Sequence, residues 1–410
     1  MYAVGIDVSK GKSMVAIASP GGKLHCKPFT VNHKPSELNK LATLLKSLGS
    51  ETKTVMEHTG RYYEPVANYL YNENLFVSAV NPLLISKYNN DSIRHVKTDK
   101  ADAIKIANYG LDKWCKLRQY SAMDAIRYQL KTLHRQFCLY TKTQTALKNN
   151  YIALLDQTFP GVNQLFSSPV REDGSQKWVD FAAKFWHIDC VAGISEEAFT
   201  EEYQDFCKEH HYNYSETKAH EIFTLAQDSI SLIPSDETTH FLLQQAYDSL
   251  QGNIRATEAL RAKMYEVASM LPEFKVVMDM GGVGKSLGPQ LMAELGDVTR
   301  FASRGSIVAY AGVDPGKNDS GDVTHKSGKC SKCGSPELRR TLFILMDGLI
   351  KRQPEDDPVY RFMDKKRSEG KPYYVYMTAG ANKFLRIYYA RVKEFMAKYN
   401  AEKEPAETSD

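Results

Sequence analysis

A long heptad repeat in the middle of the chain constrains the fold more than any other feature. From residue 126 onward, apolar side chains recur at alternating spacings of four and three, with Gln144 in the one polar slot. The repeating residues are Ile126, Leu130, Leu133, Phe137, Tyr140, Leu147, Tyr151 and Leu154. This spacing predicts a continuous helix, about 50 Å long, with a coiled-coil seam. No acidic residue lies between Asp124 and Asp156, so the outer face of this helix is basic.

A second heptad-like run offers a partner for this helix. It slips register once near Thr257, and Pro272 follows its last apolar residue. Its apolar residues are Leu243, Tyr247, Leu250, Ile254, Leu260, Met264, Val267 and Leu271. We therefore expect an antiparallel helical hairpin, which forms an arm. Residues 160–235, between the two helices, have the composition of an aromatic-rich helical insert to which the sequence assigns no role.

The residues before the arm have an α/β pattern. Apolar runs rich in β-formers occur at Tyr2–Asp7, Met14–Ala18, Leu24–Val31, Thr54–Glu57 and Phe76–Val80. A Pro-Gly-Gly turn at residues 20–22 favours an antiparallel meander of the first three runs. Helices are expected from Pro35, after Arg61 and over Thr98–Tyr109. The resulting order, β-β-β-α-β-α-β-α, is that of a ribonuclease H-like domain.

The expected organisation has four parts, because 410 residues exceed one ordinary core. Residues 1–118 form the α/β domain and residues 119–271 form the arm with its insert. Residues 272–400 form a mostly helical C-terminal domain, and residues 401–410 form a disordered charged tail.

Four acidic residues carry the predicted chemistry of the α/β domain. Asp7 ends the first strand and Glu57 ends a later one, whereas Asp99 and Asp102 share one helical face. Bringing carboxylates together is costly unless a cation lies between them. Oxygen ligands suit Mg²⁺ or Mn²⁺, and such ions stabilise the attacking and leaving oxygens in phosphodiester chemistry.

Charge and composition indicate a polyanionic partner. The net charge is +4, but residues 1–118 carry +7 and residues 358–400 another +7, so the remainder carries −10.

No apolar run approaches the roughly 20 residues that span a bilayer, and the N-terminus begins a strand with no room for a signal peptide. Seven scattered cysteines argue against a disulfide framework and for a reducing cytosol.

The strings GIDVSK, MEHTGRYY and KTDKADA resemble those of the DEDD transposases of bacterial insertion sequences. These are RuvC-like recombinases related to Piv invertases, several of them guided by a bridge RNA. The resemblance implies a RuvC-like fold, a bacterial cytoplasmic, nucleoid-associated protein and Mg²⁺ held by Asp7, Glu57, Asp99 and Asp102. It also implies donor and target DNA, a structured guide RNA, and a dimer or tetramer as partners.

The C-terminal region extends the resemblance. Residues 301–339, with the string AYAGVDP, resemble the transposase domain of that family, whose Ser-Gly nucleophile corresponds to Ser320 here. Ser327, Ser331 and Ser335 are weaker rivals. The string GGVGKS at residues 281–286 is not a P-loop, because Asp279 stands where the first glycine is needed. It favours a helix–hairpin–helix-like turn whose amides meet a phosphate, although a plain tight turn has the same composition.

Basic residues within these elements are predicted to contact nucleic acid. They are Lys10, Arg61, Arg127, Lys131, Arg135, Lys285, Arg339, Lys365, Lys366 and Arg367. Residues 360–399 also interleave cations with aromatic rings, a pattern that serves phosphates and unpaired bases as well as core packing. Cys330 and Cys333 form one CxxC pair, with His325 as a third candidate zinc ligand. No second pair is present to complete a structural zinc site.

Three other functions stay open at this point. A RuvC-like junction resolvase would use the four acids and water, with no covalent link to protein. An ATP-binding protein of the actin–hexokinase type would need a second phosphate loop, which the sequence does not show. A nucleic-acid-binding protein without catalysis would not need all four acids. The direction of a transposase reaction, whether insertion, excision or inversion, also stays open.

Overall fold

The computed structural model describes residues 1–49, 51–58, 60–88, 98–120, 123–314, 319–320, 323–324 and 330–403. The chain divides into two compact units, Met1–Met123 and Asp124–Asp410, each considered by itself below. The predicted boundary at residue 271 does not separate compact units, because the arm and the C-terminal helices share a core. Within the described residues, no helix is long and apolar enough to cross a membrane.

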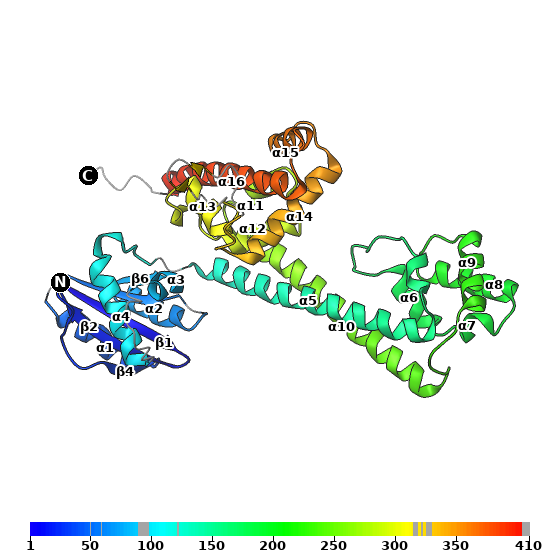
Figure 1. Cartoon of the computed structure of the whole chain (residues 1–410), viewed down its shortest axis with the longest axis horizontal. Coiled ribbons are helices and arrows are strands. Elements are labelled where there is room, and N and C mark those ends of the chain that lie inside the picture. The colour runs from blue at the N-terminus through cyan, green and yellow to red at the C-terminus, as the bar shows by residue number, and fades with distance from the viewer. Residues whose placement is uncertain are drawn as a thin grey trace. The chain divides into compact units, whose positions relative to one another are not determined.

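The first unit is built on a six-stranded mixed sheet (Figure 1). Its strands are β1 (Tyr2–Ser9), β2 (Lys12–Ser19), β3 (Lys23–Leu24), β4 (Phe29–Asn32), β5 (Thr52–Glu57) and β6 (Phe76–Val80). They lie in the order β3-β2-β1-β5-β6, and β4 also pairs with β2. Strands β1 and β2 are antiparallel, whereas β5 is parallel to both β1 and β6. This is the ribonuclease H-like arrangement that the element order predicted, and it agrees with the RuvC-like fold that the resemblance implied.

Helices cover both faces of this sheet. They are α1 (Pro35–Ser47), α2 (Tyr63–Asn72), α3 (Pro82–Ser86) and α4 (Asp99–Asp112), with a 3₁₀ turn at Trp114–Lys116. Apolar residues of α1 and α2 share a core with Val4, Ile6 and Met56 of the sheet. The prediction missed α3, a single turn capped by Asn81, and it joined β3 and β4 into one strand. Both short strands pair with β2, so the predicted meander is confirmed in outline.

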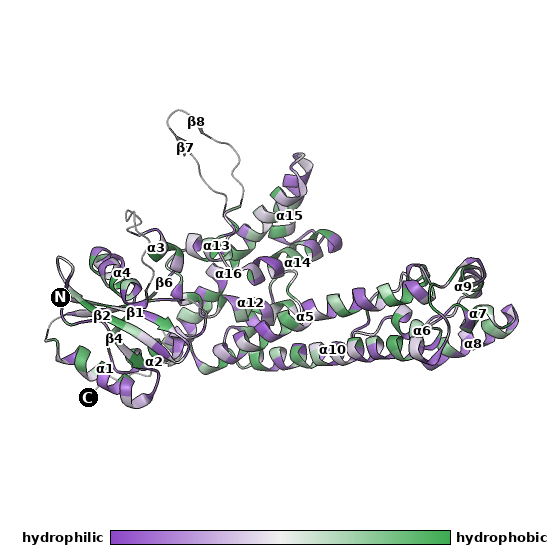
Figure 2. Ribbon diagram, turned by 60° about the horizontal axis from the view of Figure 1, so that its bottom comes forward, coloured by the Kyte–Doolittle hydropathy of each residue, from purple (hydrophilic) through white to green (hydrophobic). Residues whose placement is uncertain are grey.

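The second unit begins with the predicted arm. Helix α5 (Ala125–Thr158) packs along α10 (Glu237–Ser269), and apolar and polar residues alternate around both helices (Figure 2). The rings of Tyr151 and Tyr247 lie 6.3 Å apart, and the guanidinium of Arg261 lies 5.7 Å from the ring of Phe137. Residues with higher numbers on α5 contact residues with lower numbers on α10, so the two helices are antiparallel, as predicted.

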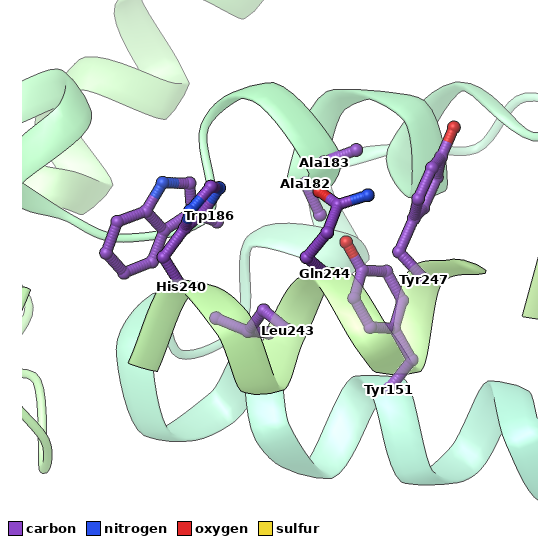
Figure 3. Close-up of a pocket in the computed structure, with 8 residues that line it drawn as sticks. All are labelled: Tyr151, Ala182, Ala183, Trp186, His240, Leu243, Gln244 and Tyr247. Carbon is purple, nitrogen blue, oxygen red and sulfur yellow. The ribbon is translucent and has the colours of Figure 1, made fainter. Parts of the chain in front are cut away.

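The insert between the arm helices is helical, as its composition predicted. It contains η2 (Val162–Leu165), α6 (Lys177–Lys184), α7 (Asp189–Ala192), α8 (Glu196–Glu209) and α9 (Glu216–Asp228). Rings of Phe181, Phe185 and Phe206 stack or meet edge-on in its core. A small pocket lies where the insert meets the arm (Figure 3). Its lining residues are Tyr151, Ala182, Ala183, Trp186, His240, Leu243, Gln244 and Tyr247.

The C-terminal region is mostly helical, as predicted. Its elements are α11 (Phe274–Met278), α12 (Leu287–Leu295), η3 (Val298–Arg300), α13 (Arg304–Ala311), β7 (Asp319–Ser320), β8 (Val323–Thr324), α14 (Pro336–Arg352), α15 (Pro358–Ser368) and α16 (Tyr373–Lys403). Leu130, Phe137 and Met264 of the arm belong to the same hydrophobic core as these helices. Helix α16 continues through Lys403, so a disordered tail from residue 401 was wrong for its first three residues; residues 404–410 lie outside the described part.

A buried ion pair joins the start of the arm to the C-terminal helices. Arg127, with 6% of its side chain exposed, donates to both carboxylate oxygens of Glu273, at 2.6 and 3.1 Å. Its Nε lies 2.9 Å from Asp124, which also caps α5. Burial raises the pKa of Glu273, and the charge of Arg127 opposes that rise. The pair therefore fixes the direction in which α5 leaves this core.

Candidate functional site

Two of the predicted acids lie near the carboxyl ends of neighbouring parallel strands. Glu57 is the last residue of β5, whereas Asp7 lies two residues before the end of β1, which continues past the predicted end to Ser9. In the register of β1 and β5, Ile6 pairs with Met56, so Asp7 and Glu57 are the next residues along each strand. Successive side chains of a strand alternate between the faces of a sheet. Because Ile6 and Met56 lie in the core with α1 and α2, Asp7 and Glu57 belong to the opposite face. That face is covered by α4.

Helix α4 lies on the sheet at unusually short range because β1 contains Gly5. A Cβ atom at Gly5 would lie 2.1 Å from the carbonyl oxygen of Ala103 and 2.3 Å from the amide nitrogen of Ala107. Further along the helix, Gly110 sits over Ala3, where an added Cβ would approach the Ala3 methyl to 3.2 Å. The helix therefore runs opposite to β1, and its N-terminus points toward the end of the strand that carries Asp7.

The other two predicted acids begin that helix. Thr98 caps it by accepting a hydrogen bond from the amide of Ala101, at 3.2 Å, and Asp99 and Asp102 fill the first turn. Carboxylates there are stabilised by the helix dipole. Asp99 lies four residues before Ala103, which contacts the sheet, and Asp102 lies directly before Ala103. Both acids therefore lie on or beside the face of α4 that packs on the sheet. The packing thus directs both acids toward the strand ends of Asp7 and Glu57.

The donor set fits a hard divalent cation, because all four residues offer carboxylate oxygens. Among the described residues, however, no group of three or more acidic, histidine or cysteine side chains is close enough to hold a metal ion. Like-charged carboxylates gain nothing by approaching one another without a cation between them. The strand ends and the helix start are brought to one edge of the sheet, whereas the four carboxylates are not drawn into a ligand shell.

We expect Gly5→Ala to destabilise the first unit by about 1–3 kcal/mol and to abolish DNA cleavage, because α4 must move off the sheet. Thermal unfolding and a cleavage assay would measure both effects. Gly252→Ala is the control, since its added methyl would meet nothing within 4 Å. Unchanged stability and activity in Gly5→Ala would show that the close approach of α4 is not needed.

Ser320, the predicted nucleophile, lies in the two-residue strand β7, where its backbone pairs with Val323 of β8. Its side chain is outside what the structure describes, as are Gly321, His325 and Ser327. The two rival serines that are described have other partners. Ser331 donates to Asp314, at 2.6 Å, and Ser335 donates to Glu294, also at 2.6 Å.

The segment that contains Ser320 leaves and rejoins the helices at one point. The amide of Ser335 donates to the carbonyl of Tyr310, at 2.9 Å, and a Cβ at Gly334 would lie 2.1 Å from that oxygen. Arg339 Nη1 donates to the carbonyls of Ala311 and Gly334, at 3.1 and 3.0 Å. We call these contacts the clasp. The clasp was not predicted from the sequence, although Gly312 and Gly334, one at each end of the segment, are a usable signal.

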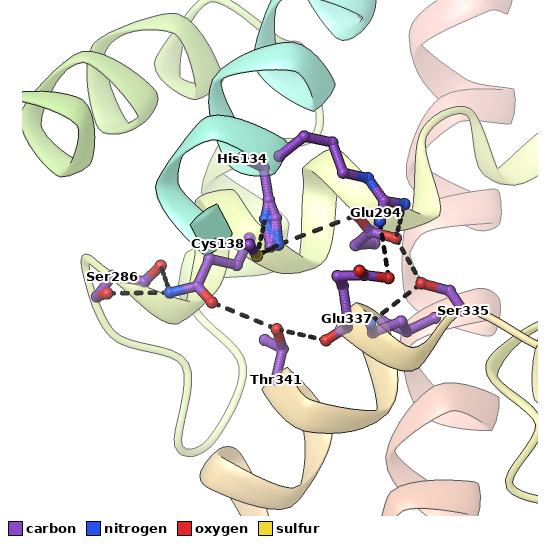
Figure 4. Close-up of polar contacts among 10 residues, drawn as sticks. His134, Cys138, Ser286, Glu294, Ser335, Glu337 and Thr341 are labelled. Carbon is purple, nitrogen blue, oxygen red and sulfur yellow. Dashed lines mark hydrogen bonds and ion pairs between the residues drawn. The ribbon is translucent and has the colours of Figure 1, made fainter. Parts of the chain in front are cut away.

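The clasp is tied to the arm through a buried carboxylate (Figure 4). Glu294 of α12 is 1% exposed, and its Oε2 accepts from Arg135 of α5 at 3.0 Å as well as from Ser335. Arg135 also pairs with Glu337 of α14, at 2.7 Å. Three helices therefore meet at one charged cluster, next to the base of the Ser320 segment.

His134 lies beside this cluster and gives the fold a pH dependence. Burial and the neighbouring charge of Arg135 lower the pKa of His134 to about 4, although Glu337 opposes the shift and Arg340 adds to it. Its Nε2 lies 3.9 Å from Glu294 Oε1, too far for a hydrogen bond, and 3.5 Å from the Cys138 sulfur. The unfolded chain binds this proton near pH 6.5, so stability is lost as the pH falls from 6.5 toward 4.

We expect the free energy of unfolding to fall by about 2 kcal/mol between pH 7 and pH 4.5, measured through the shift in urea midpoint. His134→Gln should remove this part of the pH dependence. His220→Gln, which replaces an exposed histidine, should keep it. An identical pH profile in His134→Gln and the unmodified chain would contradict the assignment.

The residues predicted to contact nucleic acid divide into those that remain candidates and those that have structural partners. The candidates are the exposed Lys10, Arg61, Lys285, Lys365 and Arg367 and the half-buried Lys131 and Lys366. Arg127 is buried in its ion pair with Glu273, so assigning it to nucleic acid was wrong. Arg135 and Arg339 are half-buried, and their guanidinium groups hold the Glu294 cluster and the clasp. We assign both to these structural contacts.

The glycine-rich turn lies between α11 and α12, as a helix–hairpin–helix-like element requires. Gly282 has a φ of 79°, and a Cβ at Gly281 would lie 1.9 Å from a carboxylate oxygen of Asp357. Gln290 ties the turn to α14, donating to the Ser286 carbonyl at 3.1 Å and accepting from Thr341 at 3.3 Å. These contacts account for the first two glycines without a phosphate.

The two cysteines of the CxxC pair contact backbone within the described part of the chain. Cys330 Sγ donates to the carbonyl of Gly312, at 2.7 Å, and Cys333 Sγ to that of Ser331, at 3.3 Å. The first contact belongs to the base of the Ser320 segment. Zinc binding by this pair stays a prediction.

Comparison with known proteins is consistent with this architecture. Residues 4–160 match the DEDD transposase family of IS110 elements, and residues 274–361 match the family described as Transposase IS116/IS110/IS902. The chain therefore belongs to the IS110 family of DEDD transposases, enzymes that act on DNA.

Similar proteins include the pilin gene-inverting proteins of Moraxella lacunata and Moraxella bovis. They are 23% and 24% identical over 394 and 395 residues, which is 95% of this chain and 95% of each of them. An uncharacterized 43.6 kDa protein of insertion element IS110 from Streptomyces coelicolor is 21% identical over 73% of this chain and 71% of its own length. Among solved structures, T. thermophilus RuvC in complex with Holliday junction substrate is 13% identical, covering 28% of this chain and 96% of RuvC, with a TM-score of 0.22.

Proposed function

We propose that this transposase cuts and rejoins DNA with a serine nucleophile and a four-carboxylate Mg²⁺ or Mn²⁺ site. Asp7, Glu57, Asp99 and Asp102 would hold the ion and Ser320 would attack. The proposal is supported by the β1–β5 register and by the close contact of Gly5 with α4, which bring the ends of β1 and β5 and the start of α4 to one edge of the sheet. A divalent cation bound there would stabilise charge on the attacking and leaving oxygens.

The chemistry of Ser320 follows from the balance of bonds. Its Oγ–phosphorus bond forms as a phosphorus–deoxyribose oxygen bond breaks, and the leaving oxygen takes up the proton that the hydroxyl loses. The phosphoserine link conserves the energy of the phosphodiester, so a second deoxyribose hydroxyl can displace Ser320 and reseal the strand. Water in place of Ser320 would give free ends, as expected of a nuclease or junction resolvase.

Ser320 and the acids belong to separate compact units, and we infer that the working enzyme is a dimer or tetramer. One subunit's Ser320 would then meet the carboxylates of another. We also propose a structured guide RNA. The basic first unit suits it, because duplex RNA is bound chiefly through backbone and shape. Purifying the protein with cellular RNA and sequencing what stays bound tests this part separately.

Trapping the covalent intermediate tests the main proposal. Denaturing gels of a reaction with end-labelled DNA should show a protein–DNA adduct that vanishes in Ser320→Ala. Ser303→Ala is the matched control, since Ser303 caps α13 outside the Ser320 segment. Cleaved DNA without any adduct would favour the nuclease, and an adduct that persists in Ser320→Ala would assign the nucleophile elsewhere.

A further inference from the structure

An exposed aromatic pair stands at the start of α16. Tyr374 is 73% exposed and Tyr373 is 44% exposed, whereas Phe384, Tyr388 and Tyr389 of the same helix are buried in the core. The interleaved rings of the sequence thus separate into a core set and a surface set. The surface pair contributes little to the core and leaves a large apolar area in water.

The exposed rings are held in place by their neighbours. The Tyr373 and Tyr374 ring centroids lie 5.3 Å apart in an edge-on arrangement, and Phe343 of α14 lies 6.4 Å from Tyr374. Tyr373 also meets the buried Tyr376, at 5.5 Å. A ring fixed in this way can receive a flat partner with little further loss of conformational freedom.

Cations border the rings. Arg340, Ile344 and Lys351 are exposed on α14 at spacings of four and seven, so they share one face of that helix. Burial raises the pKa of the Tyr373 hydroxyl, the charge of Asp347 adds to the rise and the charge of Lys351 opposes it. Asp347 pairs with Lys351, at 2.7 Å, and Lys371 is exposed just before α16. The border therefore has a net positive charge.

We propose that this surface binds unpaired DNA bases, with Tyr374 stacking on a base and the cations of α14 and Lys371 facing phosphates. Base stacking on aromatic side chains needs bases that have left the duplex. A second copy of this chain is a poor occupant, because a symmetric contact would bring equal positive charges together. The proposal rests on the proposed function, since rejoining a strand to a new partner requires its bases to leave the old one.

Fluorescence anisotropy tests this without cleavage. The full chain is titrated, in buffer without divalent cations, into a labelled 12-nucleotide single-stranded DNA, the matching duplex and an RNA of the same sequence. Tyr374→Ala should weaken single-stranded DNA binding about 5- to 100-fold and leave duplex binding within about twofold. Tyr374→Phe should retain binding. Phe241→Ala, an exposed ring at the far end of the arm (60% exposed), should bind as the unmodified chain does.

Lys371→Gln offers a second variant that leaves the rings intact. It should lower the slope of log affinity against log salt by about 0.7 for single-stranded DNA. The proposal is overturned if Tyr374→Ala binds single-stranded DNA normally, or if it loses duplex binding equally. It is also overturned if Phe241→Ala weakens single-stranded DNA binding as much as Tyr374→Ala does. If Tyr374→Ala weakens the binding of RNA alone, the proposal is likewise overturned, because RNA would then be the occupant. Binding is measured without Mg²⁺ and without cleavage. Failure to trap a Ser320 adduct would therefore count against the proposed function and not against binding of single-stranded DNA by Tyr374.

Discussion

Asp7→Asn is expected to lower the rate of DNA strand cleavage on the order of a thousandfold while leaving the fold intact. Asparagine keeps the shape of the side chain but removes the charge that a divalent cation needs. A bound cation contributes several kcal/mol to the transition state of phosphoryl transfer, and each 1.36 kcal/mol is a factor of ten in rate. Single-turnover cleavage at increasing Mg²⁺ is the measurement, since a weakened site should also need more metal.

Glu51→Gln is the matched control for this prediction. Glu51 precedes β5 at the opposite edge of the sheet from Glu57, and its side chain is exposed. It should cleave at the unmodified rate with the same Mg²⁺ requirement. If Asp7→Asn cleaved as fast as Glu51→Gln, the carboxylate site at the ends of β1 and β5 would be excluded.

Arg127→Ala is expected to destabilise the second unit by about 3–5 kcal/mol, the largest effect on stability that we predict. The substitution leaves Glu273 buried with its charge unpaired, which costs far more than the pair contributes. The shift in urea midpoint, followed by circular dichroism of the helices, measures it. Arg127→Met with Glu273→Leu should recover most of the loss, because no buried charge then remains.

Arg367→Ala is the control that shows whether the loss of stability in Arg127→Ala comes from burial or from the loss of a charge pair alone. Arg367 pairs with Asp364 at 2.7 Å on the surface of α15, and such exposed pairs contribute less than about 1 kcal/mol. Equal losses in Arg127→Ala and Arg367→Ala would contradict an effect that depends on desolvation.

The sequence predicted those features that depend on local periodicity. The apolar runs predicted the sheet and placed Glu57 at the end of β5 and Asp7 within two residues of the end of β1, and the heptad spacing predicted the antiparallel arm. The close approach at Gly5 was not predictable, because a lone glycine in a strand does not reveal which helix lies above it. The same limit applies to Arg127, whose partner Glu273 is 146 residues away. A basic residue on a predicted outer face can be recognised as a core residue only when the packing of a distant helix is known.

The clasp has a consequence for how proteins of this kind can change. Both ends of the Ser320 segment are held by backbone contacts, so its length is nearly independent of the helices on either side. The entropy cost of closing a longer loop grows only slowly with its length. Natural or engineered insertions between Asp314 and Cys330 should therefore be tolerated, and they could change how far the proposed nucleophile Ser320 extends from the helices without altering their packing.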